Sequence, residues 1–386
     1  MGKQRMRILY LTTAMSEKYF NEYCKNARIK PNPSNQNFHL KLIKSLATQF
    51  NVEVISLRPF SSKMFDEYTL EETYRREDDL TFYYVKESSS LLDRALFLER
   101  DIVSFASDLI EDDTIIVVDT LNEHLLRSAL KIREKFKTLI VGVLSDNPAN
   151  ITGISKHYVR AINSNICDMD GYIALTDGLN ALFNKKNKPF YKLNGLVDNY
   201  RPFDKQEENY YFFGGALYER YGVLDMIEAF SKSSVKEKLV IAGHGELEPT
   251  IREISLKNAQ IKFLGTVSKE TMYSYEQHAI ACINPRRYDD RLDKESIPSK
   301  VLEYAGNKAL IISTISKELQ NVFNDSVIWV SERRKLVEAI NFVAKLKIAQ
   351  RHEYANSAYE IATTQYSISE RGKHLFAFIS SLIKSR

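Results

Sequence analysis

Short apolar runs alternate with amphipathic segments along the whole chain, and this alternation limits the possible folds more than any other feature. Arg7–Thr12 and Thr114–Val118 are such runs in the first half, and Tyr210–Phe213 and Lys238–Ala242 are their counterparts in the second half. Strands buried on both faces of a parallel sheet have this composition, and a helical pattern follows each of them. With 386 residues in total, we therefore expect two α/β domains.

The predicted boundary between the domains is a segment that is rich in charge and almost without core residues. Residues 199–209 contain a proline and few apolar side chains, which is typical of an interdomain linker. The first domain is therefore predicted over 1–198, and the second over 210–365. No internal repeat or low-complexity tract interrupts either of them.

Composition and charge exclude several classes of protein. The chain is 44% hydrophobic and 27% charged, and no apolar run reaches the roughly 18 residues that a membrane-spanning helix needs. Its N-terminal apolar run is too short for a signal peptide, so we expect a cytoplasmic protein. The net charge of +4 is spread along the chain, which argues against a nucleic-acid binder. Cys24, Cys167 and Cys282 lack metal-binding spacing, so neither a disulfide nor a metal site is expected.

One local excess of basic side chains lies near the N-terminus, around His39. Solvated surface is the simpler interpretation of such a cluster. The alternative is a surface that meets a phosphate-bearing acceptor or the anionic inner face of a membrane, which would make the protein peripherally membrane-associated. The basic residues are Lys18, Lys25, Arg28, Lys30, Lys41 and Lys44.

A highly charged loop in the second half leads into a helix whose start suits an anion. The loop follows Asn284-Pro285, contains Arg286, and ends at Pro298-Ser299-Lys300. Proline fits the first turn of a helix, and the amides of Ser299, Lys300 and Val301 are expected to point back into the loop. Because Lys300 adds a full positive charge to this helix start, the pattern predicts a phosphate or diphosphate site.

Two glutamates, Glu295 and Glu303, lie eight residues apart on either side of this helix start. A carboxylate can accept hydrogen bonds from two vicinal hydroxyls, so one could hold a hexose and the other a ribose. A solvated charged loop ahead of an ordinary amphipathic helix is the competing interpretation of the charges alone.

Two glycine loops follow strands of the same predicted domain. Gly214-Gly215 comes after Tyr210–Phe213, with Arg220 nearby, and Gly243-His244-Gly245 comes after Lys238–Ala242. Glycines allow a backbone to approach a ligand closely, and an arginine beside them can bind phosphates. The second loop taken alone is better explained as a tight turn.

At these residues the chain resembles the retaining glycosyltransferases of family four, which have the GT-B fold and a Glu-x7-Glu motif. The resemblance rests on three motifs in order: Asn284-Pro285-Arg286, Pro298-Ser299-Lys300 and Leu302-Glu303-Tyr304. This pattern is similar to that of members from bacterial surface-polysaccharide clusters. It implies two Rossmann-like domains facing a central cleft, with residues 366–386 crossing back to complete the first. The resemblance further implies that no metal is needed. It also implies a UDP- or GDP-sugar as donor and a saccharide as acceptor, with a lipid-diphosphate-linked saccharide as one candidate.

The resemblance also implies roles for single residues. Arg220 and Lys300 would stabilise the leaving diphosphate, Glu295 would bind the hexose and Glu303 the ribose, and Asp146 could assist at a position where the family usually has histidine. The remaining donor-binding candidates are Gly214, Gly215, Gly243, Gly245, Val267, Arg286, Ser299 and Val301.

The chain departs from the family pattern at two positions of the first glycine loop. Relatives often place arginine after the first glycine and lysine before the last, but Gly215 and Tyr221 stand there. These departures keep a second hypothesis open, a non-catalytic GT-B subunit that binds a glycan or stabilises a partner transferase. A nucleotide-sugar 2-epimerase of the same fold is the third.

Overall fold

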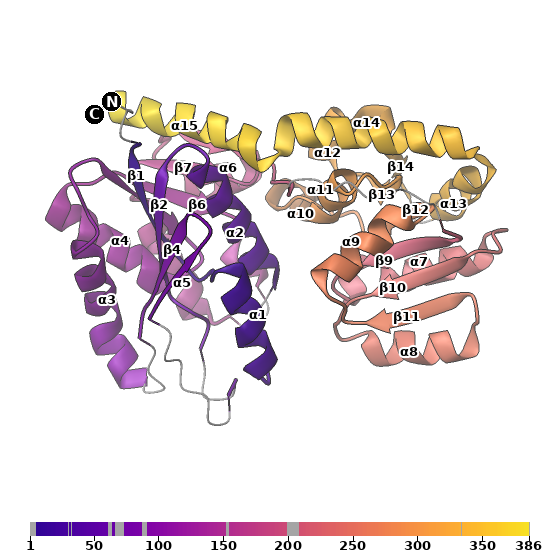
Figure 1. Ribbon diagram of the computed structural model, residues 1–386, viewed down its shortest axis with the longest axis horizontal. Coiled ribbons are helices and arrows are strands. Elements are labelled where there is room, and N and C mark those ends of the chain that lie inside the picture. Colours follow the sequence, from indigo (N-terminus) through magenta and orange to yellow (C-terminus); the bar gives the residue numbers. More distant parts are fainter. Residues whose placement is uncertain are drawn as a thin grey trace. The chain divides into compact units, whose positions relative to one another are not determined.

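The computed structural model describes residues 5–29, 31, 33–60, 64–65, 73–86, 91–151, 154–198, 208–332 and 334–385, with the backbone alone for 91–96. The chain forms two compact units (Figure 1). Unit 1 comprises Met1–Leu196, Lys294–Ser296 and Ile368–Arg386, and unit 2 comprises Val197–Asp293 and Ile297–Ser367. The boundary thus falls after Leu196, whereas the sequence predicts it after Asp198. Most of the predicted linker, and Lys30 of the basic cluster, lie outside the described residues.

Unit 1 contains an eight-stranded sheet with β1 near its centre. All neighbouring strands pair in parallel except β3 and β4. The strands, in sheet order, are β3 (Tyr74–Glu77), β4 (Leu80–Tyr84), β2 (Asn51–Ser56), β1 (Arg7–Thr12), β5 (Thr114–Asp119), β6 (Ile140–Leu144), β7 (Gly171–Ala174) and β8 (Phe190–Lys192).

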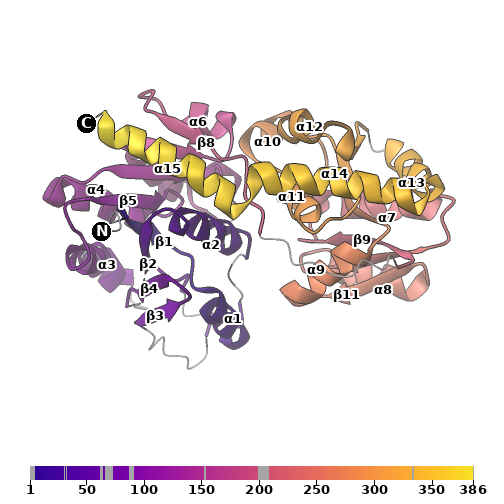
Figure 2. The same cartoon turned by 45° about the horizontal axis from the view of Figure 1, so that its top comes forward.

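Helices cover both faces of this sheet, because the strand side chains are apolar on each face (Figure 2). One face packs on α1 (Glu17–Asn26), α2 (Pro33–Ala47) and α15 (Ile368–Lys384). The other face packs on α3 (Leu91–Ser107), α4 (Glu123–Phe136), α5 (Lys156–Ile166) and α6 (Asp177–Phe183). A short 3-10 turn, η1 (Pro148–Asn150), follows β6.

The C-terminal helix α15 belongs to unit 1 and packs closely on α2. The hydroxyl of Ser45 donates a hydrogen bond to the carbonyl of Ile368 at 2.8 Å. A Cβ added at Gly372 would lie 2.1 Å from Oγ1 of Thr48, so the two helices approach as closely as they do because this residue is glycine.

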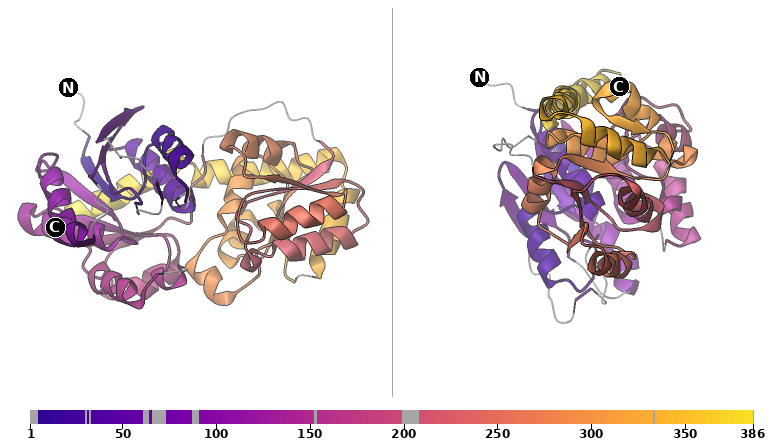
Figure 3. Two further views of the ribbon diagram at one scale, coloured as in Figure 1. Left: turned by 90° about the horizontal axis from the view of Figure 1, so that it is seen from below. Right: turned by 90° about the vertical axis from the view of Figure 1, so that its right-hand side faces the viewer.

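Unit 2 contains a fully parallel six-stranded sheet. In sheet order its strands are β11 (Ile261–Gly265), β10 (Lys238–Ala242), β9 (Tyr210–Gly214), β12 (Ala281–Asn284), β13 (Ile311–Thr314) and β14 (Ile328–Val330). The helices of this unit, drawn in salmon through orange to yellow in Figure 3, lie on both faces of the sheet.

The apolar core on one face of this sheet includes α7 (Val223–Lys232), α8 (Glu248–Lys257) and α13 (Lys335–Lys345). On the opposite face, α9 (Lys269–His278) packs on β9, and α11 (Ser299–Gly306) packs on β12 and β13. The other elements of the unit are η2 (Glu219–Tyr221), α12 (Lys317–Phe323), η3 (Asn324–Ser326) and α14 (Ile348–Tyr366); the short α10 (Asp290–Glu295) ends in residues assigned to unit 1.

Two segments that are rich in polar side chains contain helices. Helix α1 lies within residues 14–34, because Tyr19 and Tyr23, four residues apart, are buried on one helix face. The side chain of Ser16 accepts a hydrogen bond from the amide of Tyr19 and caps the helix start. The charged loop after β12 likewise contains the short helix α10.

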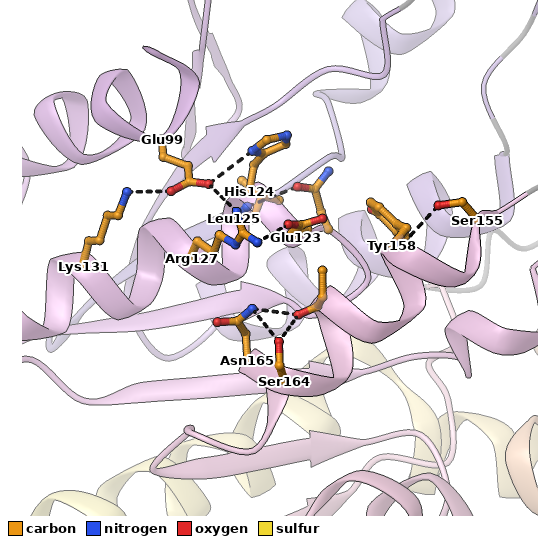
Figure 4. Close-up of polar contacts among 12 residues, drawn as sticks. Glu99, Glu123, His124, Leu125, Arg127, Lys131, Ser155, Tyr158, Ser164 and Asn165 are labelled. Carbon is orange, nitrogen blue, oxygen red and sulfur yellow. Dashed lines mark hydrogen bonds and ion pairs between the residues drawn. The ribbon is translucent and has the colours of Figure 1, made fainter. Parts of the chain in front are cut away.

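An ion cluster joins α3 to α4 in unit 1 (Figure 4). The carboxylate of Glu99 lies 2.6 Å from Nζ of Lys131, 3.4 Å from Nδ1 of His124 and 3.6 Å from Nη1 of Arg127. Burial opposes ionisation of Glu99, but hydrogen bonds from His124 and Lys131 outweigh it and lower its pKa to about 2. The cluster therefore stabilises the packing of the two helices.

No helix in the part of the chain that the structure describes is both long and apolar enough to cross a membrane.

Candidate functional site

The order of strands in unit 2 places a topological switch point between β9 and β12. From β9 the chain proceeds to β10 and β11 on one side, and it then returns to β12 on the other side. In open parallel sheets, ligands bind beyond the carboxyl ends of the strands at such a point. Gly214-Gly215 and Asn284-Pro285 end the two strands here, and both segments belong to the sequence-predicted site.

The two glycine loops pack backbone to backbone at this edge. The amide of Gly215 donates to the carbonyl of Ala242 at 3.0 Å, and the amide of Leu217 donates to the carbonyl of His244 at 2.9 Å. Gly243 has φ +141°, and a Cβ there would lie 1.8 Å from the carbonyl oxygen of Gly215. No other residue fits at Gly243, so this glycine serves the turn and the contact between loops, as the simpler sequence interpretation held.

Helix α11 brings Lys300 to the first glycine loop. A Cβ built on Gly215 would lie 3.4 Å from Cε of Lys300. One turn further on, the hydroxyl of Tyr304 accepts a hydrogen bond from the amide of Gly214 at 3.2 Å. The structure thus brings together Gly214, Gly215 and Lys300, which are far apart in the sequence.

Lys300 lies between two carboxyl groups. Its Nζ is 2.7 Å from Oε1 of Glu303 and 3.9 Å from Oε1 of Glu276, a residue of α9. Burial by itself would lower the pKa of Lys300, but the charge and the hydrogen bond of Glu303, its nearest partner, act against burial and raise that pKa. Lys300 is therefore a firmly charged ammonium group beside the loop.

Glu276 is fully buried, with 0% of its surface exposed. Its Oε2 accepts a hydrogen bond from Nδ2 of Asn307 at 2.5 Å, while its Oε1 has no hydrogen-bond partner among the described residues. Burial, and then the charge of Glu303, raise the pKa of Glu276 well above its ordinary value, against the opposing effect of Lys300. The sequence prediction missed this residue, because one glutamate in a helical stretch gives no signal of burial.

The start of α11 differs in one detail from the prediction. Pro298 precedes the helix and Ser299 begins it, with Ser299 exposed, as the pattern indicates. The amide of Val301, however, donates to the carbonyl of Pro298 at 3.0 Å, and its side chain is fully buried. The prediction of a free amide at Val301 is therefore wrong, because a tight first turn already uses it.

The arginines after β12 take different positions. The guanidinium of Arg287 makes two contacts with the Asp225 carboxylate, at 2.8 and 3.3 Å, which tie this loop to α7. Arg286 is half-buried, and its Nη2 donates to the carbonyl of Leu292 at 3.5 Å. Both arginines line a small hollow at the carboxyl ends of β12 and β13.

Arg220 and Val267 lie on two separate loops of unit 2, after β9 and β11. Arg220 is exposed, and its guanidinium stacks over the rings of Tyr218 and Tyr221 at 5.4 and 5.1 Å from their centroids. Val267 is half-buried and follows β11, directly before Ser268, which caps α9. The carboxyl groups that contact Lys300 belong to Glu276 and Glu303, so the lysine meets neither of these two loops through an ion pair.

Glu295 and Asp146 belong to unit 1. The Glu295 carboxylate accepts hydrogen bonds from Nδ2 of Asn147 at 3.0 Å and from Nδ2 of Asn150 at 2.6 Å. Asp146 instead accepts a hydrogen bond from the amide of Asn147 at 2.7 Å. The sequence prediction selected Asp146 and missed these two asparagines, although a run of polar residues after a strand is a signal for all of them.

Within the ranges described, no group of three or more histidine, cysteine, aspartate or glutamate side chains is arranged to hold a metal ion.

Comparisons with known proteins agree with this geometry. The model of the family described as Glycosyl transferases group 1 matches residues 200–361. No curated protein sequence matches the chain.

Solved structures resemble the chain over almost its whole length. The sucrose-phosphate synthase of Thermosynechococcus elongatus is similar with a TM-score of 0.70 at 11% identity, over 98% of this chain and 100% of that one. HepE of Anabaena, solved with UDP and glucose, has a TM-score of 0.65 at 13% identity, over 97% and 100%. The lipopolysaccharide outer core galactosyltransferase WaaB has a TM-score of 0.60 at 13% identity, over 97% and 99%. The predicted GT-B fold is confirmed.

Proposed function

We propose that the chain is a glycosyltransferase that transfers a hexose from a nucleotide-diphosphate sugar to an acceptor hydroxyl, with retention. Its GT-B fold and the match of residues 200–361 to the model of the family described as Glycosyl transferases group 1 support this proposal. The observation that carries this proposal is the position of Lys300, a charged ammonium group beside the backbone of Gly215 at the switch point.

In this proposal the diphosphate of the donor lies against the Gly215 loop and the start of α11. Lys300 and the amides at that helix start stabilise the negative charge that develops on the leaving diphosphate. Arg220 is assigned to the same task, because its loop follows Gly215 and its exposed guanidinium lies over the rings of Tyr218 and Tyr221.

Glu303 is assigned to the ribose hydroxyls and Glu295 to the hexose hydroxyls. Each carboxylate can accept two hydrogen bonds from vicinal hydroxyls. For retention, the acceptor hydroxyl attacks the anomeric carbon on the face that the diphosphate leaves, and its proton passes to the departing phosphate oxygen. No metal and no covalent nucleophile are assigned, and Asp146 is kept as an assisting group.

We further propose a role in bacterial cell-surface polysaccharide or glycoconjugate assembly, in the cytoplasm or at the inner face of the membrane. The residue pattern at Asn284-Pro285-Arg286 and Pro298-Ser299-Lys300 supports this role, and the structural likeness to WaaB agrees with it. A lipid-diphosphate-linked saccharide would be the acceptor, and UDP or GDP the leaving nucleotide.

The test is to incubate the protein with a panel of UDP-, GDP- and dTDP-sugars and to measure release of nucleoside diphosphate. Slow hydrolysis of one donor is expected, accelerated by the correct acceptor, and the anomeric configuration of the product reports retention. Binding of a nucleotide sugar without turnover, even with acceptor extracts, would instead favour the non-catalytic subunit. No binding of any donor would contradict both.

A further inference from the structure

Among the residues that the structure describes, Glu276 is a fully buried carboxyl group that contacts the proposed diphosphate site and has no role assigned in it. We propose that Glu276 is a positioning residue: it holds Lys300 beside the Gly215 loop as a neutral carboxylic acid, so that the lysine's charge stays available to a diphosphate. This inference rests on the proposed function, because it concerns the same lysine.

The contacts of Glu276 fix its place from two sides. Nδ2 of Asn307, at the end of α11, donates to Oε2 of Glu276 at 2.5 Å, and the thiol of Cys282 on β12 donates to the backbone carbonyl of Glu276 at 3.5 Å. The first bond holds the carboxyl group with Oε1 3.9 Å from Nζ of Lys300. Glu276 thus lies behind the lysine while Glu303 contacts it from its own helix.

The balance of charge requires that Glu276 be neutral. If Glu276 and Glu303 were both ionised, one ammonium group would face two carboxylates, and the cluster would repel a diphosphate. An ionised carboxylate that is fully buried with one oxygen unbonded is also costly. With a proton on Glu276, the cluster has no net charge, and the ammonium group can bind an anion.

The other titratable groups around Glu276 support this state. Glu303 and Lys300 face it from α11, together with the phenol of Tyr304, whose pKa is raised by burial and by the Cys282, Glu276 and Glu303 side chains. On α9, the phenol of Tyr273 donates to Oδ2 of Asp198 at 2.8 Å and has a pKa raised mainly by burial and Asp198. Both phenols therefore remain neutral, and Lys300 is the single cation among these groups.

The test compares Glu276→Gln with Glu276→Ala, and uses Glu270→Gln as the matched control on an exposed position of the same helix. Calorimetry measures the affinity for UDP and GDP at pH 8. Glutamine reproduces a neutral acid that accepts from Asn307, so its affinity is expected within about threefold of the unchanged protein. Alanine removes the support behind Lys300, and an affinity about tenfold weaker is expected.

Two outcomes would overturn the inference while leaving the proposed function in place. If glutamine weakens binding as much as alanine, Glu276 acts as an ionised partner of Lys300. If alanine binds as tightly as the unchanged protein, Glu276 does not position the lysine. A protein that binds neither nucleotide, with Glu276 present, would instead contradict the proposed donor site and the inference with it.

A second measurement decides the matter if Glu276→Ala does not fold. In the unfolded chain the pKa of a glutamate is about 4.5, whereas burial raises the pKa of Glu276 in the folded protein. Above pH 4.5 the unfolded chain therefore releases a proton that the folded protein keeps. The unchanged protein loses stability as pH rises above that value. Glu276→Gln has no such loss. The melting temperature of this variant is therefore expected to rise relative to that of the unchanged protein between pH 5 and pH 9. A difference that stays constant with pH means that Glu276 is not a buried neutral acid.

Discussion

The carboxyl edges of the two sheets differ, although both sheets switch direction beside their first strand. In unit 2 the edge at β9 and β12 consists of glycine backbone with Lys300 beside it. In unit 1 the corresponding edge lies at β1 and β5, and three buried side chains fill it: Tyr10, His39 and Asp119.

The three side chains of the unit 1 edge form one network. The Tyr10 hydroxyl lies 2.7 Å from Nδ1 of His39, and Nε2 of His39 lies 3.3 Å from Oδ2 of Asp119. The amide of Leu121 donates to Oδ1 of Asp119 at 3.0 Å, so this carboxylate also stabilises the turn after β5. Burial alone would raise the pKa of Asp119, but the charge and hydrogen bond of His39 lower it.

This difference teaches that one topology supports two uses of the same edge. Backbone amides with Lys300 beside them leave an edge that an anion can approach, whereas the buried network of Tyr10, His39 and Asp119 stabilises unit 1.

Replacing Asp119 with alanine should destabilise unit 1 by about 3–5 kcal/mol, because a buried His39 loses its carboxylate. Denaturant unfolding with circular dichroism measures this, and Asp112→Ala, at an exposed position before β5, is the control. Since the pKa of Asp119 is lowered in the folded protein, its stabilisation is present at neutral pH and is lost as pH falls below about 4. Loss of UDP or GDP affinity with unchanged stability would contradict the comparison.

Replacing Lys300 with alanine should reduce the rate of sugar transfer about 30- to 1,000-fold, which corresponds to roughly 2–4 kcal/mol of transition-state stabilisation. Only 24% of the Lys300 side chain is exposed, and two carboxyl groups contact it, so the substitution can also affect stability. The melting temperature is therefore measured alongside the rate. Lys257→Ala, at an exposed position of α8, should change neither. Full transfer by the Lys300 variant would place the diphosphate elsewhere.

Replacing Glu303 with alanine should weaken binding of a nucleoside diphosphate about tenfold, or roughly 1.4 kcal/mol, through the lost ribose contact. The same change frees Lys300 from its partner at 2.7 Å. Inorganic pyrophosphate, which has no ribose, should therefore bind the variant at least as tightly as the unchanged protein. Calorimetry measures the affinity for both ligands. Equal losses of affinity for the nucleoside diphosphate and for pyrophosphate would refute a ribose contact.

Replacing Glu99 with glutamine should cost about 1 kcal/mol, because its three partners, His124, Arg127 and Lys131, are partly solvated. Its pKa of about 2 means that this contribution is present above pH 4.5 and disappears as pH falls toward 2. Urea unfolding at pH 7 and at pH 3 measures the change. The effect should be confined to stability, and a change in donor affinity would contradict the assignment of this cluster to helix packing.

The sequence by itself determined the architecture and most of the donor loop. Continuous apolar runs such as Arg7–Thr12 and Tyr210–Phe213 predict buried parallel strands, since only strands covered on both faces tolerate them. Pro298-Ser299-Lys300 predicts a helix start, because proline has no backbone N–H and fits where the helix needs no hydrogen bond from that N–H. These are local properties, and neighbours in the chain suffice to set them.

Tertiary structure alone decided which charges meet. Glu276 becomes a buried partner of Lys300 because α9 and α11 lie on one face of the sheet, and no spacing in the sequence encodes that contact. The carboxylate of Glu295 accepts hydrogen bonds from Asn147 and Asn150, which precede it by more than a hundred residues. Burial and long-range pairing set the protonation and the aim of a side chain, and both arise only when distant segments pack together.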